Sequence, residues 1–147
     1  MPHTFRHVVV GTDFGPSSQR ALELATKLVE GTDARLTVVH VAEIPPLAYA
    51  GLSFSTADIV GSIEEAAGVT LEEAMKSVRA RVPGAESSLR RGPAWEAILD
   101  VAADERADLV VVGTHGRRGI PHALLGSVAE KVVRLARVPV LTVRGEE

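Results

Sequence analysis

Short aliphatic runs alternate with segments of helical hydrophobic spacing along this chain, and this alternation constrains its fold more than any other feature. Strands joined by helices are typical of βαβ units, which build a parallel sheet covered by helices. The first run is almost wholly apolar, as expected for a strand buried on both faces. We therefore predict an α/β fold with strands at His7–Gly11, Arg35–Val41, Ala85–Arg91, Leu109–Val112 and Val140–Val143.

Helix signals separate these strands. Pro16-Ser17-Ser18 starts the first helix and Gly31 ends it, while Pro93 fits the first turn of the third. The second helix is predicted over residues 62–82, with Gly68 as a candidate break or kink. Residues 42–60 are rich in Pro, Gly and Ser and are predicted to form a long loop, either a lid over a ligand or a passive surface loop.

Composition limits the classes of protein that remain. The 147 residues suit a single domain, 1–147, and the aromatic share of 3% predicts an aliphatic core. With 16 basic and 19 acidic residues, the chain lacks the basic excess typical of nucleic-acid binders. There is no cysteine, and no apolar stretch approaches the roughly 20 residues that span a bilayer. We expect a cytoplasmic protein without a nucleic-acid or membrane partner.

A glycine-rich stretch follows the fourth predicted strand and precedes the last helix. It has Gly113, then Gly116, then nine residues, then Gly126-Ser127. Glycines let the backbone approach phosphate oxygens closely, and the N-terminus of a helix attracts anions. The stretch therefore predicts a phosphate-binding loop, although Ser127-Val128-Ala129-Glu130 also has the pattern of a capping box, which needs no ligand.

A second polar segment, Gly11-Thr12-Asp13, leaves the carboxyl end of the first strand. In open parallel sheets ligands bind at that end of the strands, so this segment and the glycine-rich stretch would share one crevice if the first and fourth strands are adjacent. The Asp13 carboxylate could accept hydrogen bonds from a ribose hydroxyl or an adenine amino group, or help hold a divalent cation. The sequence does not choose among these roles. Nor does it decide whether Arg117 and Arg118 clamp phosphates or are simply solvated.

Other nucleotide-binding and catalytic motifs are missing from the sequence. There is no Gly-x-x-x-x-Gly-Lys-Ser/Thr, no Gly-x-Gly-x-x-Gly after the first strand and no Gly-x-Ser-x-Gly. These absences argue against a P-loop NTPase, a dinucleotide-binding domain and an α/β-hydrolase. A receiver domain is disfavoured as well, because Ser87 to Arg91 offers no phosphorylatable aspartate after the third strand.

The glycine spacing, together with Val8-Val9-Val10-Gly11-Thr12-Asp13 and the closing Val138-Pro139-Val140-Leu141-Thr142-Val143, resembles the universal stress proteins of the nucleotide-binding type. This resemblance covers nearly the whole chain. It implies a Rossmann-like, five-stranded parallel sheet of order 3-2-1-4-5 with helices on both faces. It also implies ATP, accompanied by Mg²⁺ or Mn²⁺, and a homodimer formed through Val138–Val143.

The resemblance also implies a set of binding residues. Gly11, Thr12 and Asp13 would lie at the nucleoside, with Val41 beside the adenine. Val112 and Gly113 would flank the ribose. The triphosphate would be surrounded, mainly through backbone N–H groups, by His115, Gly116, Gly126, Ser127 and Val128. Gly15 departs from the serine common in relatives after Asp-Phe.

Three functions are compatible with these features. The first is an ATP-binding regulatory protein, with the role in stress responses implied by the resemblance alone. The second is a slow ATPase, for which Asp13 or His115 would be the catalytic candidates, although the sequence assigns no arginine finger or general base. The third is a nucleotide-free dimeric scaffold. Dimerisation has a physical motive too, because an apolar edge strand at Val140–Val143 leaves backbone groups without partners until another strand covers it.

Overall fold

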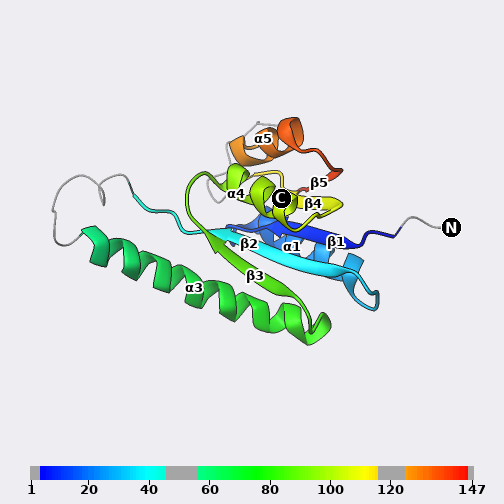
Figure 1. The fold of residues 1–147 in the computed structure, drawn as a ribbon, viewed down its shortest axis with the longest axis horizontal. Helices are drawn as coiled ribbons and strands as arrows, with labels where there is room; N and C mark the ends of the chain where they lie inside the picture. The colour runs from blue at the N-terminus through cyan, green and yellow to red at the C-terminus, as the bar shows by residue number, and fades with distance from the viewer. Residues whose placement is uncertain (1–3, 46–55, 116–124, 146–147) are drawn as a thin grey trace.

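The computed structural model describes residues 4–45, 56–115 and 125–145 of the chain. Strands and helices alternate through these residues, and Figure 1 shows them in their order along the chain. The elements are β1 (His7–Gly11), α1 (Pro16–Val29), β2 (Arg35–Val41), α3 (Thr56–Arg81), β3 (Glu86–Arg90), α4 (Ala94–Asp104), β4 (Leu109–Gly113), α5 (Ser127–Leu135) and β5 (Val140–Val143).

The five strands form one all-parallel sheet of order β3-β2-β1-β4-β5, which confirms the predicted fold class and strand order. β1 lies at the centre, where Val9 pairs in register with Thr37 of β2 and with Val110 of β4. The polar strand β3 and the apolar strand β5 are the two edges of this sheet. The chain proceeds to opposite sides of β1, first to β2 and later to β4, so the strand order reverses between β1 and β4.

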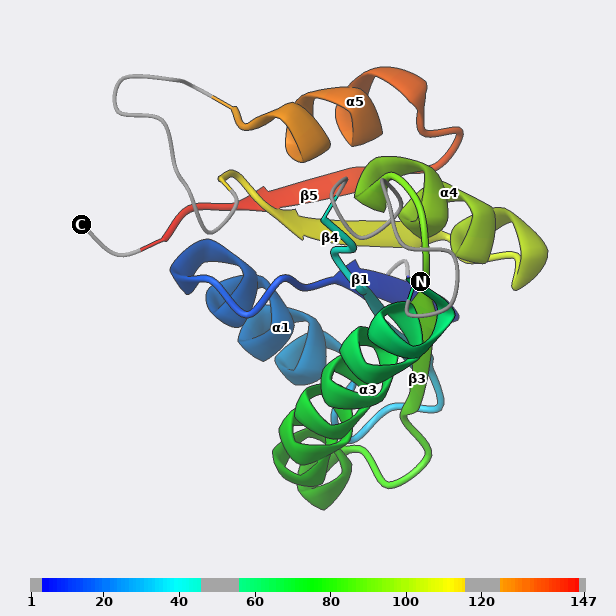
Figure 2. The same ribbon diagram turned by 90° about the vertical axis from the view of Figure 1, so that its left-hand side faces the viewer.

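Helices cover both faces of the sheet, and the sheet divides the core into two aliphatic clusters (Figure 2). On one face, α1 and α3 pack against the side chains of Val8 and Val10. On the other, α4 and α5 pack against Val9 and its neighbours. Alternate residues of β1 thus point into different clusters, which is why the whole strand is apolar. The sheet forms a rigid base for whatever lies at its carboxyl edge.

Helix α3 corrects the predicted boundaries of the second helix. It begins at Thr56, inside the segment predicted as a loop over residues 42–60, and continues through Gly68 without a break. The buried side chains of Leu71, Met75 and Val78 bind its second half to the sheet. Gly68 packs beside Leu89 of β3, where an added Cβ would lie 3.7 Å from the Leu89 side chain. Packing against the sheet therefore keeps the helix continuous at a residue of low helix propensity.

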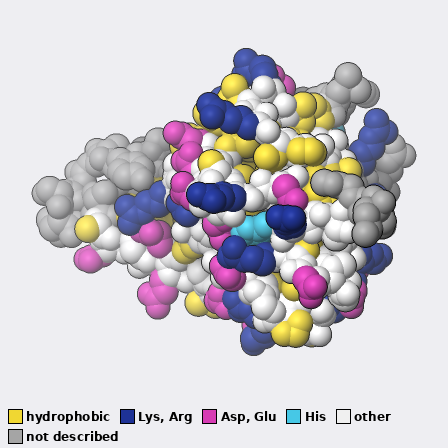
Figure 3. Space-filling model, turned by 45° about the vertical axis from the view of Figure 1, so that its right-hand side comes forward, with side chains coloured by type: hydrophobic (Ala, Val, Ile, Leu, Met, Phe, Trp, Pro, Cys, Tyr) yellow, Lys and Arg dark blue, Asp and Glu magenta, His cyan; other side chains and the backbone are white. Residues whose placement is uncertain are grey.

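The surface carries charges of both signs. Basic and acidic side chains are intermixed on the described part of the face in Figure 3. Several are paired, as between Arg35 and Glu86, whose N and O atoms lie 3.3 Å apart. Within the described ranges, none of the helices is both long enough and apolar enough to cross a membrane.

Candidate functional site

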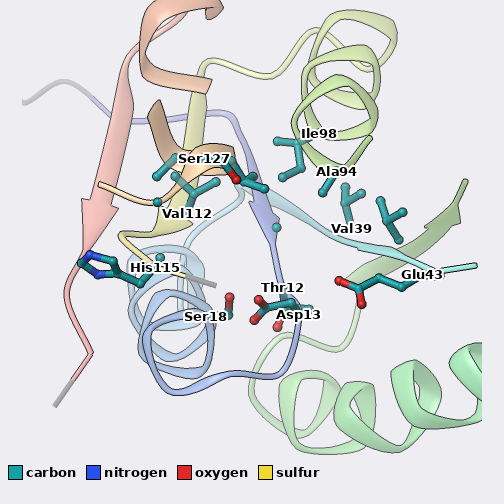
Figure 4. Close-up of a pocket in the computed structure, with 16 residues that line it drawn as sticks. Thr12, Asp13, Ser18, Val39, Glu43, Ala94, Ile98, Val112, His115 and Ser127 are labelled. Carbon is teal, nitrogen blue, oxygen red and sulfur yellow. The ribbon is translucent and has the colours of Figure 1, made fainter. Parts of the chain in front are cut away.

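A cavity opens at the carboxyl edge of the sheet, where β1 and β4 end side by side (Figure 4). Its volume is about 120 Å³, and it adjoins a more open hollow of about 700 Å³. The two hollows share wall residues from the loop that follows β1, from the end of β2 and the loop after it, and from the first turns of α4 and α5: Thr12, Asp13, Val41, Glu43, Ala94 and Val128. The cavity lies at the reversal of strand order, the usual place for a ligand in an open α/β sheet.

The loop after β1 is held by its own hydrogen bonds. The Thr12 N–H donates to the carbonyl of Val39 (2.9 Å), and the Thr12 hydroxyl accepts a bond from the Phe14 N–H (3.1 Å). The Gly15 N–H donates to Asp13 Oδ1 at 2.8 Å, in the manner of an Asx turn. Phe14 takes a left-handed backbone conformation with φ of 64°. This sharp turn directs Asp13 toward the cavity (Figure 4).

His40, on β2, supports the same loop from behind. Its Nδ1 lies 2.9 Å from the carbonyl oxygen of Thr12, and its ring packs on Phe14 with the centroids 4.5 Å apart. A carbonyl oxygen can only accept, so the Nδ1 atom is the donor in this bond. His40 therefore holds the loop in place from the neighbouring strand.

The ends of the glycine-rich stretch are fastened to each other by the backbone. The Gly126 N–H donates to the carbonyl of Thr114 at 2.6 Å, and the Thr114 N–H donates to the carbonyl of Val143 at 2.9 Å. The first bond brings the start of α5 to the end of β4, while the second connects that strand end to β5. Thr114 and Gly126, twelve positions apart in the sequence, therefore converge at one wall of the cavity.

Helix α1 fixes the beginning of the stretch. The Ser17 hydroxyl donates a short hydrogen bond to the carbonyl of His115. Beside it, Gly113 approaches the helix so closely that an added Cβ would lie 2.7 Å from Ser17 C and 2.8 Å from Ser18 N. Gly113 is therefore required for the packing of β4 against α1, whether or not a ligand binds.

The start of α5 differs from the capping box suggested by the sequence. The N-cap is Gly126, and Ser127 is already the first helical residue, with no side-chain hydrogen bond capping the helix. A capping box requires the serine at the N-cap position, one residue earlier in the helix frame than Ser127 lies. The first turn of α5 therefore has no side-chain cap, and its residues Ser127, Val128 and Ala129 line the cavity.

Ten of the eleven predicted binding residues line the cavity: Gly11, Thr12, Asp13, Val41, Val112, Gly113, His115, Gly126, Ser127 and Val128. Gly116 lies outside the described residues, as do Arg117, Arg118 and His122. His115 borders the cavity, but its ring points away from the other labelled side chains in Figure 4, and its Nδ1 lies 3.1 Å from the Thr114 hydroxyl. Its backbone is better placed than its ring to meet a ligand.

Some lining residues were not predicted from the sequence. Val39 and Ile98 form an apolar wall, Ala94 lies in the first turn of α4, and Ser18 and Glu43 add polar groups. The apolar residues belong to runs that predict only burial. No local pattern in the sequence marks Ser18 or Glu43 as part of a site, because each reaches the cavity through the course of the chain in three dimensions.

The wall combines apolar surface with two carboxylates, those of Asp13 and Glu43. Among the described residues, His, Asp and Glu do not form a group of three that could hold a metal ion. Elsewhere on the surface, a hydrogen bond from Arg81 lowers the pKa of Glu30, and one from Arg79 lowers the pKa of Glu72. The cavity is thus built for a partly apolar ligand that brings its own polar groups.

Comparisons with known proteins agree with this arrangement. The model of the universal stress protein family matches residues 4–144. A universal stress protein of Thermus aquaticus is 38% identical over 95% of this chain and 99% of its own length. The hypothetical protein MJ0577 shares the fold with a TM-score of 0.82, at 20% identity and over 99% of both chains. A universal stress protein in complex with cAMP has a TM-score of 0.69 and 28% identity, over 98% of this chain and 100% of its own. The chain therefore belongs to the universal stress protein family.

Proposed function

We propose that this protein binds an adenine nucleotide, ATP in the first place, in the cavity between β1 and β4. It would act in the cytoplasm as a homodimeric regulatory protein of the stress response. The adenine would lie against the apolar wall near Val41, Val39 and Ile98, and the phosphates would lie at the start of α5. A nucleotide has this same division between an apolar base and a charged end.

The observation that carries the proposal is the hydrogen bond between the Gly126 N–H and the Thr114 carbonyl. This bond places the uncapped first turn of a nine-residue helix at the edge of the cavity. Backbone N–H groups in the first turn of a helix have no partner within the helix, and they favour an anion together with the helix dipole. The apolar wall on the other side explains why the anion would be part of a larger molecule.

A divalent cation fits this site as a companion of the nucleotide. Mg²⁺ usually keeps several water molecules and is bound by one or two carboxylates together with substrate phosphates. A single carboxylate suffices beside the phosphates, and two carboxylates line the cavity, those of Asp13 and Glu43. The described residues contain no group of three or more side chains that could hold a metal ion. The phosphates and water molecules would therefore supply most of the ligands of the cation.

Isothermal titration of the nucleotide-stripped protein with Mg-ATP, ADP, AMP and GTP tests this function. We expect micromolar binding that is selective for adenine and that weakens at least tenfold, about 1.4 kcal/mol, in Gly126→Val. Gly84→Val is the matched control, because an added Cβ at Gly84 meets no atom within 4 Å. Repeating the ATP titration with a chelator measures the contribution of the cation. No heat with any adenine nucleotide at millimolar concentration would refute the proposal.

Cyclic AMP is a second candidate ligand, favoured by the similarity to a universal stress protein in complex with cAMP. It shares the base and the ribose ring with ATP, but it carries a single phosphate charge and its 3′ oxygen is esterified. Titrated in parallel, it would bind more tightly than ATP if the cavity is built mainly around the nucleoside. Tighter binding of ATP would indicate that the start of α5 receives the outer phosphates.

The homodimer is proposed to form through Val138–Val143. β5 is an edge of the sheet, hydrogen-bonded to β4 on one side, and its four residues are only partly buried. On the neighbouring helix α5, Val133 and Leu135 are 46% and 47% exposed. A second β5 related by two-fold symmetry would pair antiparallel with this strand and cover apolar side chains beside it.

A further inference from the structure

One largely buried side chain carries a hydroxyl group that has no hydrogen-bond partner among the described residues. Seven polar side chains of the described residues are at most 7% exposed. Six of them make hydrogen bonds: His7, Thr12, Ser17, Thr26, Thr37 and Thr114. Ser18, which is 6% exposed, makes none with another described residue. Buried polar groups in proteins are nearly always hydrogen-bonded, so this exception requires an explanation.

The neighbours of Ser18 on α1 show how such groups are normally satisfied. Ser17 donates to the carbonyl of His115, and Thr26 donates to the carbonyl of Leu22 one turn earlier (2.7 Å). Ser18 instead lines the cavity, and in Figure 4 its hydroxyl points into it. In the described residues, every side-chain N or O atom that is sealed from solvent has a hydrogen-bond partner. The Ser18 hydroxyl has none among these residues, so it must be exposed to the cavity. Its partner must come from there.

The surroundings of Ser18 indicate which part of a nucleotide it would meet. The Asp13 carboxylate lines the same cavity and lies on the Ser18 side of it in Figure 4. A carboxylate repels a phosphate but accepts hydrogen bonds from neutral hydroxyl groups, while a serine hydroxyl both donates and accepts. The two together match a pair of adjacent hydroxyl groups. The ribose of a nucleotide carries such a pair, at its 2′ and 3′ positions.

We infer that Ser18 and Asp13 bind the ribose hydroxyls, and that Ser18 gives the site its preference for ribonucleotides over deoxyribonucleotides. The inference rests on the proposed nucleotide-binding function. The sugar would lie between the apolar wall, which takes the base, and the start of α5, which takes the phosphates. A site with buried polar groups aimed at a substrate hydroxyl discriminates against the analogue that lacks it, because those groups are then left without partners.

Titrations with ATP, 2′-deoxy-ATP and 3′-deoxy-ATP test the inference in the wild type, Ser18→Ala and Ser127→Ala. The wild type should bind ATP about tenfold more tightly than at least one of the two deoxy analogues. In Ser18→Ala the affinity for ATP should fall to that of this analogue, so that the discrimination drops below about twofold. Ser127→Ala, at the phosphate end, should weaken all three ligands alike and keep the discrimination.

Two results would overturn the inference while leaving the proposed function intact: ATP binding without discrimination in the wild type, or discrimination that survives in Ser18→Ala. If no adenine nucleotide binds to the wild type, both fail together. Thermal unfolding provides a further readout. Ser18→Ala should unfold at the wild-type temperature or above it, because the change removes a hydroxyl without a protein partner and alanine favours a helix. A clearly lower Tm would reveal such a partner and would also count against the inference.

Discussion

Substituting Gly113 by alanine should destabilise the protein much more than the same change at Gly11. A Cβ at residue 113 would lie 2.7 Å from Ser17 C and 2.8 Å from Ser18 N, both atoms of the α1 backbone. A Cβ at residue 11 would meet the side chain of Ile98, whose Cγ1 would lie 3.0 Å away and whose terminal methyl group can rotate. A helix backbone cannot move aside as a side-chain terminus can, so the clash at residue 113 must push α1 away from β4.

The expected magnitude follows from the cost of overpacking, typically about 1 to 3 kcal/mol. We expect about 3 kcal/mol for Gly113→Ala and about 1 kcal/mol for Gly11→Ala. Neither glycine has a positive φ, so neither substitution adds backbone strain. Both variants gain the same roughly 0.4 to 1 kcal/mol by restricting the unfolded chain, and this gain cancels in the comparison.

Urea denaturation followed by far-UV circular dichroism measures the difference. At this chain length 1 kcal/mol corresponds to about 2 to 4 °C in Tm, so thermal scans should separate the two variants by several degrees. The m-values should stay equal, which would show that the comparison concerns the native packing. If Gly113→Ala is as stable as Gly11→Ala, the close approach of β4 to α1 is not a constraint on the fold, and the reasoning is refuted.

Two further predictions concern the surface. If the proposed homodimer forms through β5, Val140→Lys should give a monomer in sedimentation equilibrium with the circular dichroism spectrum unchanged; an unaltered mass would remove β5 from the proposed interface. The hydrogen bond from Arg81 (2.7 Å) holds the pKa of Glu30 below its ordinary value of 4.5. The stabilisation of the folded protein by this ion pair is therefore present above pH 4.5 and is lost as the pH falls through the lowered pKa. Arg81→Gln should therefore lower the Tm at pH 7 but not at pH 2, and carboxyl NMR should show Glu30 titrating nearer 4.5 in that variant; equal titration in both proteins would contradict this.

The sequence predicts the sheet well because each strand carries its own signal. Val8, Val9 and Val10 are apolar in succession because both faces of β1 are covered. A run of this kind predicts a buried strand without knowledge of the rest of the chain. The start of α3 at Thr56 is different. Its first turns contain a glycine and a serine, and Val60 is the one apolar side chain described as buried there, whereas Leu71, Met75 and Val78 join the core cluster further along the helix.

The parts of the site that short sequence motifs encode could be predicted from the sequence. Motif spacing located the residues around the ends of β1 and β4, but it placed Ser127 at the N-cap. Whether a residue takes the N-cap position depends on its backbone, which here is set by the bond from the Gly126 N–H to Thr114. Ser18 escaped prediction for a related reason: three hydroxyl-bearing residues on α1 are buried, and only the tertiary structure distinguishes the one that faces the cavity.

The glycines of the phosphate-binding motif consequently have different physical roles, and variants at them answer different questions. Gly113 makes room for α1, so a loss of nucleotide binding on its substitution would combine a folding defect with a binding defect. Gly126 has φ of −72° and ψ of 170°, an extended conformation that any residue adopts. A side chain there need not strain the backbone, but it would occupy the mouth of the first turn of α5. Binding lost in Gly126→Val at wild-type stability therefore reports on the approach of the phosphate alone, and this makes residue 126 the cleaner probe of the site.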